Sequence, residues 1–471
     1  MIDIDLALEP RDLSARLEHF WALSAQKIAA IEAGYDARAG SPVFTIGGRY
    51  QSRGWTEWTQ GFQYGSALLQ FEAGGDARFL EIGRANTLAK MASHVSHVGV
   101  HDHGFNNVST YGNLLRLMLE GKIPSDAWQR HFYELALKVS GAVQARRFTA
   151  AEGGGFLYSF NGPHSLFVDT ARSCRSLVLS HLLGHALMEE NDARIDLLAR
   201  ALEHLETTAR YAVYYGEGRD AYDVRGRTAH ESIFNVNDGK YRCPSSQQGY
   251  SPFSTWTRGL AWAMCGFAEQ LELVAVLPDA ELEPRGGRAF VEGFLTRAAR
   301  ATCDFYIENT PTCGVPYWDT GAPLLHRLGS YKEQPARPDN PYEPVDSSAA
   351  AIAAQGLLRL GAQLSQRNGS EGAQADGHRY RQAGLTVLRT LLGEPYLALD
   401  PAHQGLLLHS VYHRPNGWDH LPPGRSVPSG ESSMWGDYHL REMALCATKL
   451  CAGRSHQKFF DGLVRAPEAR A

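Results

Sequence analysis

The sequence lacks the features that mark several large classes of protein. Its 471 residues contain no apolar run long enough to span a bilayer, and the first residues, MIDIDLALEPRDLS, lack the basic and apolar regions of a signal peptide. The formal net charge of −5 gives no excess of positive charge that would indicate a nucleic-acid or membrane partner. We therefore expect a cytoplasmic protein with neither kind of partner.

Cysteine pairs are missing as well. The seven cysteines are scattered, no CxxC spacing occurs, and several cysteines lie inside apolar stretches such as LAWAMCGF. This pattern is typical of buried, reduced thiols in a reducing compartment and not of a disulfide framework.

Strand signals are few and short, with GGGFLYSFNG and HSLFVDT as the best candidates. Helical periodicity dominates instead, for example over residues 13–34 and 78–95, and predicts about twelve helices spread along the chain. No long linker divides the chain, and no repeat of roughly 34–47 residues indicates an α-solenoid. We therefore predict an all-α toroid, a single domain over residues 1–471, in which six inner helices are ringed by six outer ones and the long loops form a cleft at one end.

Two aspartates stand at positions where a carboxylate is able to take part in catalysis. Asp102 lies in VGVHDHGFNN, between His101 and His103. Asp169 lies in SLFVDTARSC, where a strand-like run turns into a helix. The simpler interpretations are a loop carboxylate paired with a neighbouring histidine and a helix N-cap, respectively. If both carboxylates face one cleft, their like charges raise the pKa of one of them, which then serves as a general acid near neutral pH.

A third stretch, TAHESIFNVNDGKYRCPSSQQGYSPFSTWTRGLAWAMCGFAE, contains His230, Gln248, Arg258 and Trp262. Arg258 and Trp262 are four residues apart at the start of a predicted helix and share one face of it. A guanidinium and an indole so placed are able to hold a carboxylated sugar; the alternative is a capping arginine and a core tryptophan. Tryptophans in loop-like stretches such as RGWTEWTQGF favour the sugar, because an aromatic face matches the apolar face of a pyranose.

Metal binding is the competing interpretation of His101 and His103. These histidines are two residues apart, and no HExxH or CxxC spacing supports a metal site. No GxSxG motif indicates a serine nucleophile, and no glycine-rich loop indicates a phosphate site. We therefore expect neither a metal ion nor another cofactor.

Taken together, these motifs resemble the unsaturated glucuronyl hydrolases of glycoside hydrolase family 88. The matching stretches occur in the family's order within residues 50–450 and are WTQGFQYGSALLQFEAGGD, HDHGF, VDT, QGYSPFSTWTRGLAWAMCGFAE, VPYWDT, DSSAAAIAAQGLLRL and WGDYHLREM. The resemblance implies an (α/α)6 barrel, in agreement with the helix count. It also implies an enzyme that removes a 4,5-unsaturated uronic acid from the non-reducing end of oligosaccharides left by polysaccharide lyases.

The resemblance further implies how the reaction proceeds and which residues serve it. An aspartic acid protonates C4 of the C4=C5 double bond, water adds at C5, and the hemiketal rearranges and releases the aglycone. Asp169 is implied as the general acid that also activates the water, and Asp102 as the second carboxylate, which tunes Asp169 and holds the sugar. The residues implied to surround the uronate are Trp58, His101, His230, Gln248, Arg258 and Trp262.

Three positions depart from the family's motifs. Leu260 stands where the family usually has glutamine, the run ARSC follows Asp169 in place of a methionine/asparagine run, and His103 replaces an aliphatic residue. These departures keep two alternatives open: an unsaturated rhamnogalacturonyl hydrolase acting on pectin fragments, and a non-catalytic sugar-binding toroid. The expected partner is an unsaturated oligosaccharide, and the chain is expected to be a monomer or a homodimer.

Overall fold

Helices account for most of the structure, a computed structural model that describes residues 1–54, 58–366 and 371–463. The longer helices are α1 (Ser14–Gly34), α2 (Gln60–Gly74), α3 (Ala77–Lys90), α6 (Asn113–Leu119), α7 (Ala127–Ala145), α9 (Arg175–Leu182), α10 (Leu197–Tyr211), α11 (Thr257–Val274), α13 (Gly287–Asn309), α14 (Ser347–Gln366), α15 (Glu371–Leu391) and α16 (Met434–Cys451). The shorter helical segments are α4 (Ala92–Val95), α5 (His103–Asn107), η3 (Val108–Gly112), α8 (Thr170–Ser173) and α12 (Asp279–Leu282), with single turns η1 (Pro10–Leu13), η2 (Ala37–Ala39), η4 (Glu190–Asp192), η5 (Glu283–Arg285), η6 (Leu325–Leu328) and η7 (Tyr331–Glu333).

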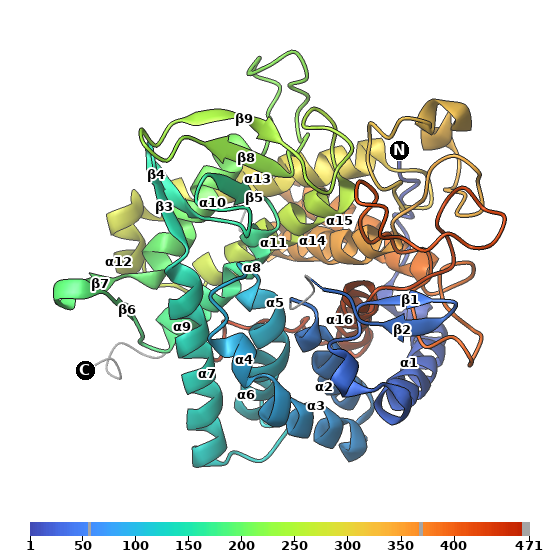
Figure 1. The fold of residues 1–471 in the computed structure, drawn as a ribbon, viewed down its shortest axis with the longest axis horizontal. Coiled ribbons are helices and arrows are strands. Elements are labelled where there is room, and N and C mark those ends of the chain that lie inside the picture. Colours follow the sequence, from blue (N-terminus) through green and yellow to red (C-terminus); the bar gives the residue numbers. More distant parts are fainter. Residues whose placement is uncertain (55–57, 367–370, 464–471) are drawn as a thin grey trace.

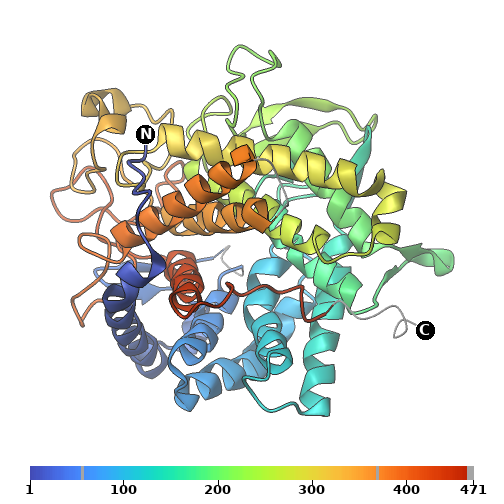
Figure 2. The same cartoon turned by 180° about the vertical axis from the view of Figure 1, so that it is seen from behind.

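The helices form two concentric layers (Figures 1 and 2). The inner ring closes because each member packs on the next, in the order α2, α5–η3–α6, α8–α9, α11, α14, α16 and back to α2. Each member of the inner ring is covered by at least one outer helix: α1 and α3 on α2, α7 on α5–η3–α6, α7 and α10 on α9, α13 on α11, α15 on α14, and α1 and α15 on α16. Inner helices such as α11 and α14 are buried along nearly their whole length, which explains their continuous apolar sequence. The predicted all-α toroid with an inner and an outer ring is confirmed.

Short antiparallel strands lie outside the ring (Figure 1). The two strand candidates in the sequence form β4 and β5, and β5 pairs with β8 so that Phe167 lies opposite Glu231. The strands are β1 (Phe44–Ile46), β2 (Arg49–Gln51), β3 (Phe148–Ala151), β4 (Gly154–Leu157), β5 (Ser165–Phe167), β6 (Leu187–Met188), β7 (Arg194–Ile195), β8 (Glu231–Phe234) and β9 (Tyr241–Ser245). The pairing of β5 with β8 matters for the site, because the residues just outside the ladder, Asp169 and His230, are thereby brought together.

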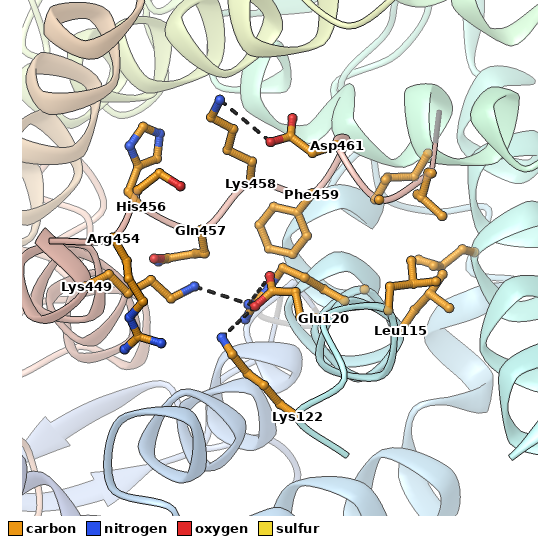
Figure 3. A pocket seen from close by; sticks show the side chains of 18 residues that line it. Leu115, Glu120, Lys122, Lys449, Arg454, His456, Gln457, Lys458, Phe459 and Asp461 are labelled. Atoms are coloured by element: carbon orange, nitrogen blue, oxygen red, sulfur yellow. Dashed lines mark hydrogen bonds and ion pairs between the residues drawn. The ribbon is translucent and has the colours of Figure 1, made fainter. Parts of the chain in front are cut away.

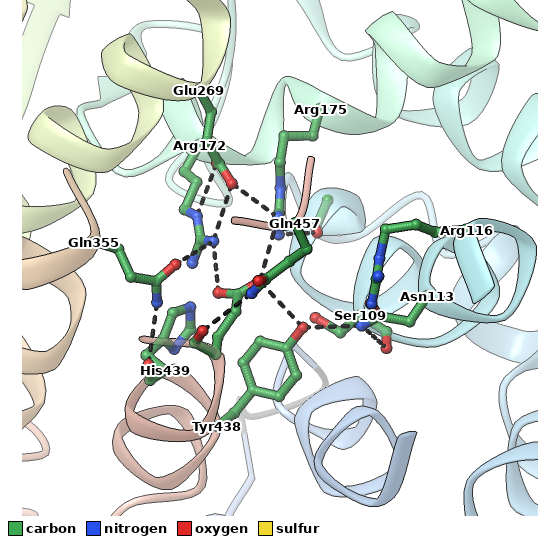
Figure 4. Close-up of polar contacts among 12 residues, drawn as sticks. Ser109, Asn113, Arg116, Arg172, Arg175, Glu269, Gln355, Tyr438, His439 and Gln457 are labelled. Carbon is green, nitrogen blue, oxygen red and sulfur yellow. Dashed lines mark hydrogen bonds and ion pairs between the residues drawn. The ribbon is translucent and has the colours of Figure 1, made fainter. Parts of the chain in front are cut away.

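The centre of the barrel is charged (Figure 4). Arg172 on α8 donates to Glu269 on α11 at 3.0 Å and to Glu442 on α16 at 2.8 Å, and Arg175 on α9 donates to Glu269 at 3.3 Å. We call these four residues the core network; all are buried. Charge-assisted hydrogen bonds of this kind connect α8 and α9 with α11 and α16, and they offset the cost of burying the charges. The sequence stretch ARSC, which departs from the family, supplies Arg172.

The end of the barrel at which α6 and α16 terminate is crossed by the C-terminal segment 454–463 (Figure 3). The cavity there, of about 580 Å³, is lined by Lys449, Arg454 and Phe459 among others, and by none of the residues predicted to act on a sugar. In the part of the chain that the structure describes, no helix combines the length and hydropathy needed to cross a bilayer.

Candidate active site

The residues singled out in the sequence gather at the other end of the ring, where α5, α8 and α11 begin. One pocket is lined there by Trp58, His101, Asp102, Asp169, Gln248, Arg258 and Trp262. His230, just before β8, lies behind this lining, because its ring accepts hydrogen bonds from the backbone N–H groups of the lining residues Gln247 and Gln248. Seven of the eight predicted residues therefore line one pocket, and the eighth supports its wall.

Asp102 and Asp169 occupy helix starts without capping them. Ordinary caps elsewhere in the chain are hydrogen bonded: Asp126 accepts from the backbone of Gln129 at 2.7 Å at the start of α7. Asp102 precedes α5 and Asp169 precedes α8, but neither side chain forms a capping hydrogen bond. The N-cap interpretation of Asp169 is therefore wrong for its side chain, which is directed elsewhere.

Both carboxylates contact the same imidazole nitrogen. His101 Nε2 lies 3.4 Å from Asp169 Oδ1 and 3.6 Å from Asp102 Oδ1. We call these three residues the carboxylate–histidine cluster. His101 is 1% exposed, and the aspartates are 6% and 7% exposed, so the charges interact with little screening by water. The phenyl rings of Phe160 and Phe167 lie 5.7 and 5.6 Å from the imidazole and 5.3 Å from each other, so the three rings pack as one group.

The histidine between the two carboxylates reverses the direction of the pKa shift that was expected for Asp169. Burial alone raises the pKa of Asp169, but the close contact with His101 and the positive charge of that histidine bring it below its usual value. For His101, burial lowers the pKa, but the charges of Asp102 and Asp169 outweigh burial and raise it. For Asp169, the expectation that like charge raises its pKa is therefore corrected: the two carboxylates instead raise the pKa of the histidine that lies between them.

Arg258 is fully engaged by the protein. Its Nη1 donates to Asp346 at 2.8 Å and to the carbonyl of Val411 at 2.6 Å, and its Nη2 donates to Gln248 at 3.1 Å and to the carbonyl of Tyr412 at 2.8 Å. The guanidinium also lies 4.7 and 5.2 Å from the rings of two buried tryptophans, Trp256 and Trp435. The expected bidentate contact between Arg258 and a sugar carboxylate is therefore not available, because both Nη atoms already donate to groups of the protein. Arg258 instead fixes the carbonyl of Gln248, which leaves the amide group of Gln248 as a donor.

His230 presents a single, defined donor. Its Nδ1 accepts from the backbone N–H groups of Gln247 at 3.0 Å and Gln248 at 3.3 Å, so the proton of the neutral ring lies on Nε2. Burial lowers the pKa of His230 to about 4, which keeps the ring neutral. Nε2 is buried and has no hydrogen-bond partner in the structure, as is typical of a group that awaits a ligand.

The tryptophans form an apolar wall. The ring of Trp58 lies 5.1 Å from Trp435 and 6.1 Å from Phe105, and Phe105 in turn lies 4.7 Å from Trp262. Trp55, in the same loop-like stretch as Trp58, lies outside the described residues. Such packed aromatic surfaces suit the apolar face of a sugar ring.

Comparisons with known proteins decide which enzymes the chain resembles. No protein-family model matches it. It is 25% identical over 394 residues to the unsaturated glucuronyl hydrolase of Bacillus sp. (strain GL1), which covers 83% of the chain and 86% of that protein. It is 26% identical over 391 residues to the unsaturated chondroitin disaccharide hydrolase of Streptococcus pyogenes serotype M1, which covers 83% of the chain and 81% of that protein. The chain is related to the unsaturated glucuronyl hydrolases. The resemblance stated from the motifs is thereby confirmed, and the chain is a glycoside hydrolase.

Solved structures give the same fold. The unsaturated glucuronyl hydrolase of Streptococcus agalactiae matches with a TM-score of 0.67 and 21% identity, over 95% of this chain and 94% of that one. An unsaturated glucuronyl hydrolase specific for heparin matches with a TM-score of 0.69 and 19% identity, over 94% of this chain and all of that one. The alternation of inner and outer helices is therefore shared along nearly the whole chain.

The three departures from the glucuronyl hydrolase motifs lie outside the pocket lining. Leu260 is 2% exposed on α11, and Arg172 belongs to the core network. His103 Nε2 donates to the carbonyl of His97 at 2.8 Å and its Nδ1 accepts from Ser140 at 2.9 Å, while burial lowers its pKa to about 4. Among the described residues, no group of three or more His, Cys, Asp or Glu side chains is placed to hold a metal ion. The departures change the packing around the site and leave its lining intact.

Several lining residues escaped the sequence reasoning. They share an origin in loops and in helix starts whose spacing carries no periodic signal, and are Phe105, Phe160, Gln247, Trp256, Tyr412, His413 and Trp418. The cluster of aromatic residues in HSVYHRPNGWDH was the one available signal for the last three.

Proposed function

We propose that the chain hydrolyses oligosaccharides that end in a 4,5-unsaturated uronic acid. The observation that supports this most is the carboxylate–histidine cluster, in which one imidazole nitrogen lies 3.4 and 3.6 Å from two carboxylates that line a pocket with an aromatic wall. The curated relatives are named hydrolases of unsaturated glucuronyl and unsaturated chondroitin substrates, and the chain covers most of their length.

The proposed reaction begins with the proton of the cluster. The substrate carboxylate adds a negative charge beside Asp169, which raises the pKa of Asp169 and draws the proton from His101 across their 3.4 Å contact. Asp169 then protonates C4 of the double bond, and positive charge develops at C5 and the ring oxygen. The resulting Asp169 carboxylate takes a proton from a water molecule as its oxygen adds to C5.

The remaining steps need little from the protein. The hemiketal at C5 opens to a ketone, which leaves C1 as a hemiacetal, and the hemiacetal releases the aglycone as an alcohol. One water molecule is consumed, one bond between sugars is broken, and the proton returns to the cluster. The bond to the aglycone is therefore never attacked directly, which is why a single proton-transfer site is sufficient.

The sugar itself is proposed to be bound by neutral donors and aromatic faces. His230 Nε2 and the amide of Gln248 donate to the carboxylate or hydroxyl groups, while Trp58 and Trp262 contact the apolar face of the ring. Arg258 contributes through its positive charge and by holding Gln248 in place.

The experiment is a panel of lyase-generated disaccharides, followed by the loss of the ultraviolet absorbance of the conjugated double bond. Because C4 and C5 are both planar in the unsaturated sugar, glucuronate- and galacturonate-derived ends have the same structure, and the panel must vary the aglycone and the linkage. We expect turnover of glycosaminoglycan-derived members and none of their saturated counterparts. Turnover confined to the rhamnogalacturonan-derived member would instead establish the pectin alternative, and binding without turnover would establish the non-catalytic one.

A further inference from the structure

The carbonyl group of His101 is held by side chains from two distant parts of the chain. Ser173 Oγ, on α8, donates to this carbonyl at 2.7 Å. Gln144 Nε2, at the end of α7, donates to it at 2.5 Å and to Ser173 Oγ at 2.9 Å. Both side chains are buried, so these hydrogen bonds do not compete with water.

Ser173 also binds the other side of Asp102. Its hydroxyl oxygen accepts from the backbone N–H of Gly104 at 3.1 Å, so one side chain bridges the residues on both sides of the aspartate. A Cβ atom at Gly104 would lie 2.2 Å from the carbonyl oxygen of Ser173. Glycine is therefore required for α5 and α8 to approach this closely, and the approach brings Ser173 within reach of His101.

These contacts set the spacing of the two carboxylates. Asp102 precedes α5 and Asp169 precedes α8, and the chain between them passes through α6, α7 and several strands. The peptide chain therefore does not fix their separation, which depends on how α5 packs against α8 (Figure 1). The distances of 3.4 and 3.6 Å from His101 Nε2 are longer than ordinary hydrogen bonds, so a small displacement of the imidazole changes which carboxylate it serves.

We propose that Ser173 and Gln144 are positioning residues that hold the imidazole of His101 between Asp102 and Asp169. Neither of them lines the pocket, and neither carries an ionisable group, so they act only through the place they give to His101. The inference deepens the proposed function, on which its kinetic test rests.

The position of His101 controls the charge of the site. Displacement of the imidazole from the carboxylates weakens their support of its positive charge, which lowers the pKa of His101 and raises that of Asp169. Both limbs of a bell-shaped pH–rate profile then move inward. The charged and titratable groups that face His101 are Asp102 on its own loop, Asp169 before α8, Arg147 before β3, His204 on α10 and His230 before β8.

The test is the variant Ser173→Ala, which removes one hydroxyl group and no charge. Loss of this buried hydrogen bond is expected to lower kcat about tenfold with KM within about twofold, and to narrow the pH profile by roughly half a pH unit on each side. Gln144→Leu removes the second donor and is expected to act in the same direction. Ser180→Ala is the matched control, because Ser180 is buried on α9 and donates only to the carbonyl of Lys138.

A readout without turnover separates this inference from the proposed function. Nuclear magnetic resonance titration of His101 is expected to give a lower pKa in Ser173→Ala than in the unaltered chain, and an unchanged pKa in Ser180→Ala. An unchanged His101 pKa in both Ser173→Ala and Gln144→Leu would overturn the positioning role, whatever the loss of activity. If the unaltered chain turns over no unsaturated substrate, the proposed function fails while the titration still decides the role of Ser173. Should Ser173→Ala not fold, Gln144→Leu gives the same answer.

Discussion

Two buried ionic clusters lie within one barrel, and they differ in how closely their oppositely charged groups approach one another. In the core network, guanidinium groups donate to carboxylates at 2.8–3.3 Å, and each glutamate faces two arginines. In the carboxylate–histidine cluster the contacts are 3.4 and 3.6 Å long, and neither ring nitrogen of His101 has a hydrogen-bond partner. Arg172 Nη1 and Arg175 Nε also lack hydrogen-bond partners, but both carboxylates of the first cluster accept hydrogen bonds from arginines. The second cluster faces a pocket, where another molecule has room to contact it.

The pKa shifts also differ between the two clusters. Burial raises the pKa of Glu442, but Arg172 and Arg175 bring it far below its usual range, so this glutamate stays ionised at any pH at which the protein functions. The cluster at the pocket combines a raised His101 pKa with a lowered Asp169 pKa. Shifted pKa values occur in structural and in catalytic clusters, but only a cluster like the one at the pocket can change its protonation state during a reaction. The difference supports the proposal that the cluster at the pocket is catalytic and the core network structural, without reference to any relative.

The largest effect is expected from Asp169→Asn. The substitution keeps the size of the side chain but removes the carboxyl group proposed to donate a proton to C4 and to accept one from water. We therefore expect kcat to fall by about 10⁴-fold, the upper end for general acid–base catalysis. KM should change little, because the amide still fits. Steady-state kinetics on an unsaturated disaccharide measure this. Asp126→Asn is the matched control, since asparagine caps a helix as well as aspartate does; comparable kcat values for the two variants would disprove the role of Asp169.

Glu442→Gln should have the opposite effect, lowering stability and leaving kcat unchanged. Breaking a buried ion pair typically costs about 3–5 kcal/mol, so the melting temperature should drop while the folded enzyme keeps its kcat. Because folding lowers the pKa of Glu442, its contribution to stability is present above the pKa of an unfolded glutamate, about 4.3, and is lost progressively as the pH falls below that value. Thermal melts at pH 7 and pH 3 should therefore show a difference from the unaltered chain that shrinks in acid. A large loss of kcat without a change in melting temperature would place Glu442 in the chemistry instead.

Asp102→Asn should act through the pH profile. The charge of Asp102 is the largest influence that raises the pKa of His101, so its removal should lower that pKa by about one unit. A protonated His101 is required for proton delivery, and the alkaline limb of the pH–rate profile should therefore move to lower pH by a similar amount. Measurement of kcat/KM from pH 4 to pH 9 gives the limb directly. A profile that keeps its alkaline limb would mean that His101 does not carry the proton.

The sequence was informative about elements that depend on periodicity. The inner helices are buried on all sides, and the apolar composition of runs such as DSSAAAIAAQGLLRL in α14 indicates that burial. The closure of the ring was predictable because twelve helices without a short repeat have few ways to cover one another. The core network was not predictable, since Arg172 and Glu269 read as polar residues in otherwise apolar stretches and their pairing depends on contacts between separate helices.

The site was predictable as a set of residues and less so as an electrostatic system. The motifs located Asp102, Asp169 and Gln248, but the spacing between residues carries no information about which atom lies between two carboxylates. The position of the His101 imidazole, which reverses the pKa of Asp169, arises from the contact of α5 with α8. The pairing of Arg258 with Asp346 was missed for the same reason, because the two residues meet only after the loops at the end of the barrel are folded.

The smallest effect is expected from removal of metal ions. His101 and His103 lie close in the sequence, but His103 is turned into the packing between His97 and Ser140, so the two rings do not converge on one point in the structure. The proposed chemistry needs a proton, which the cluster supplies, and a water molecule from solvent, which Asp169 activates. Exhaustive dialysis against a chelator should therefore leave kcat and KM within about twofold of their starting values, a range set by ordinary structural perturbation. A loss of activity that zinc or calcium restores would contradict this and would return the histidines of this loop to the role of metal ligands.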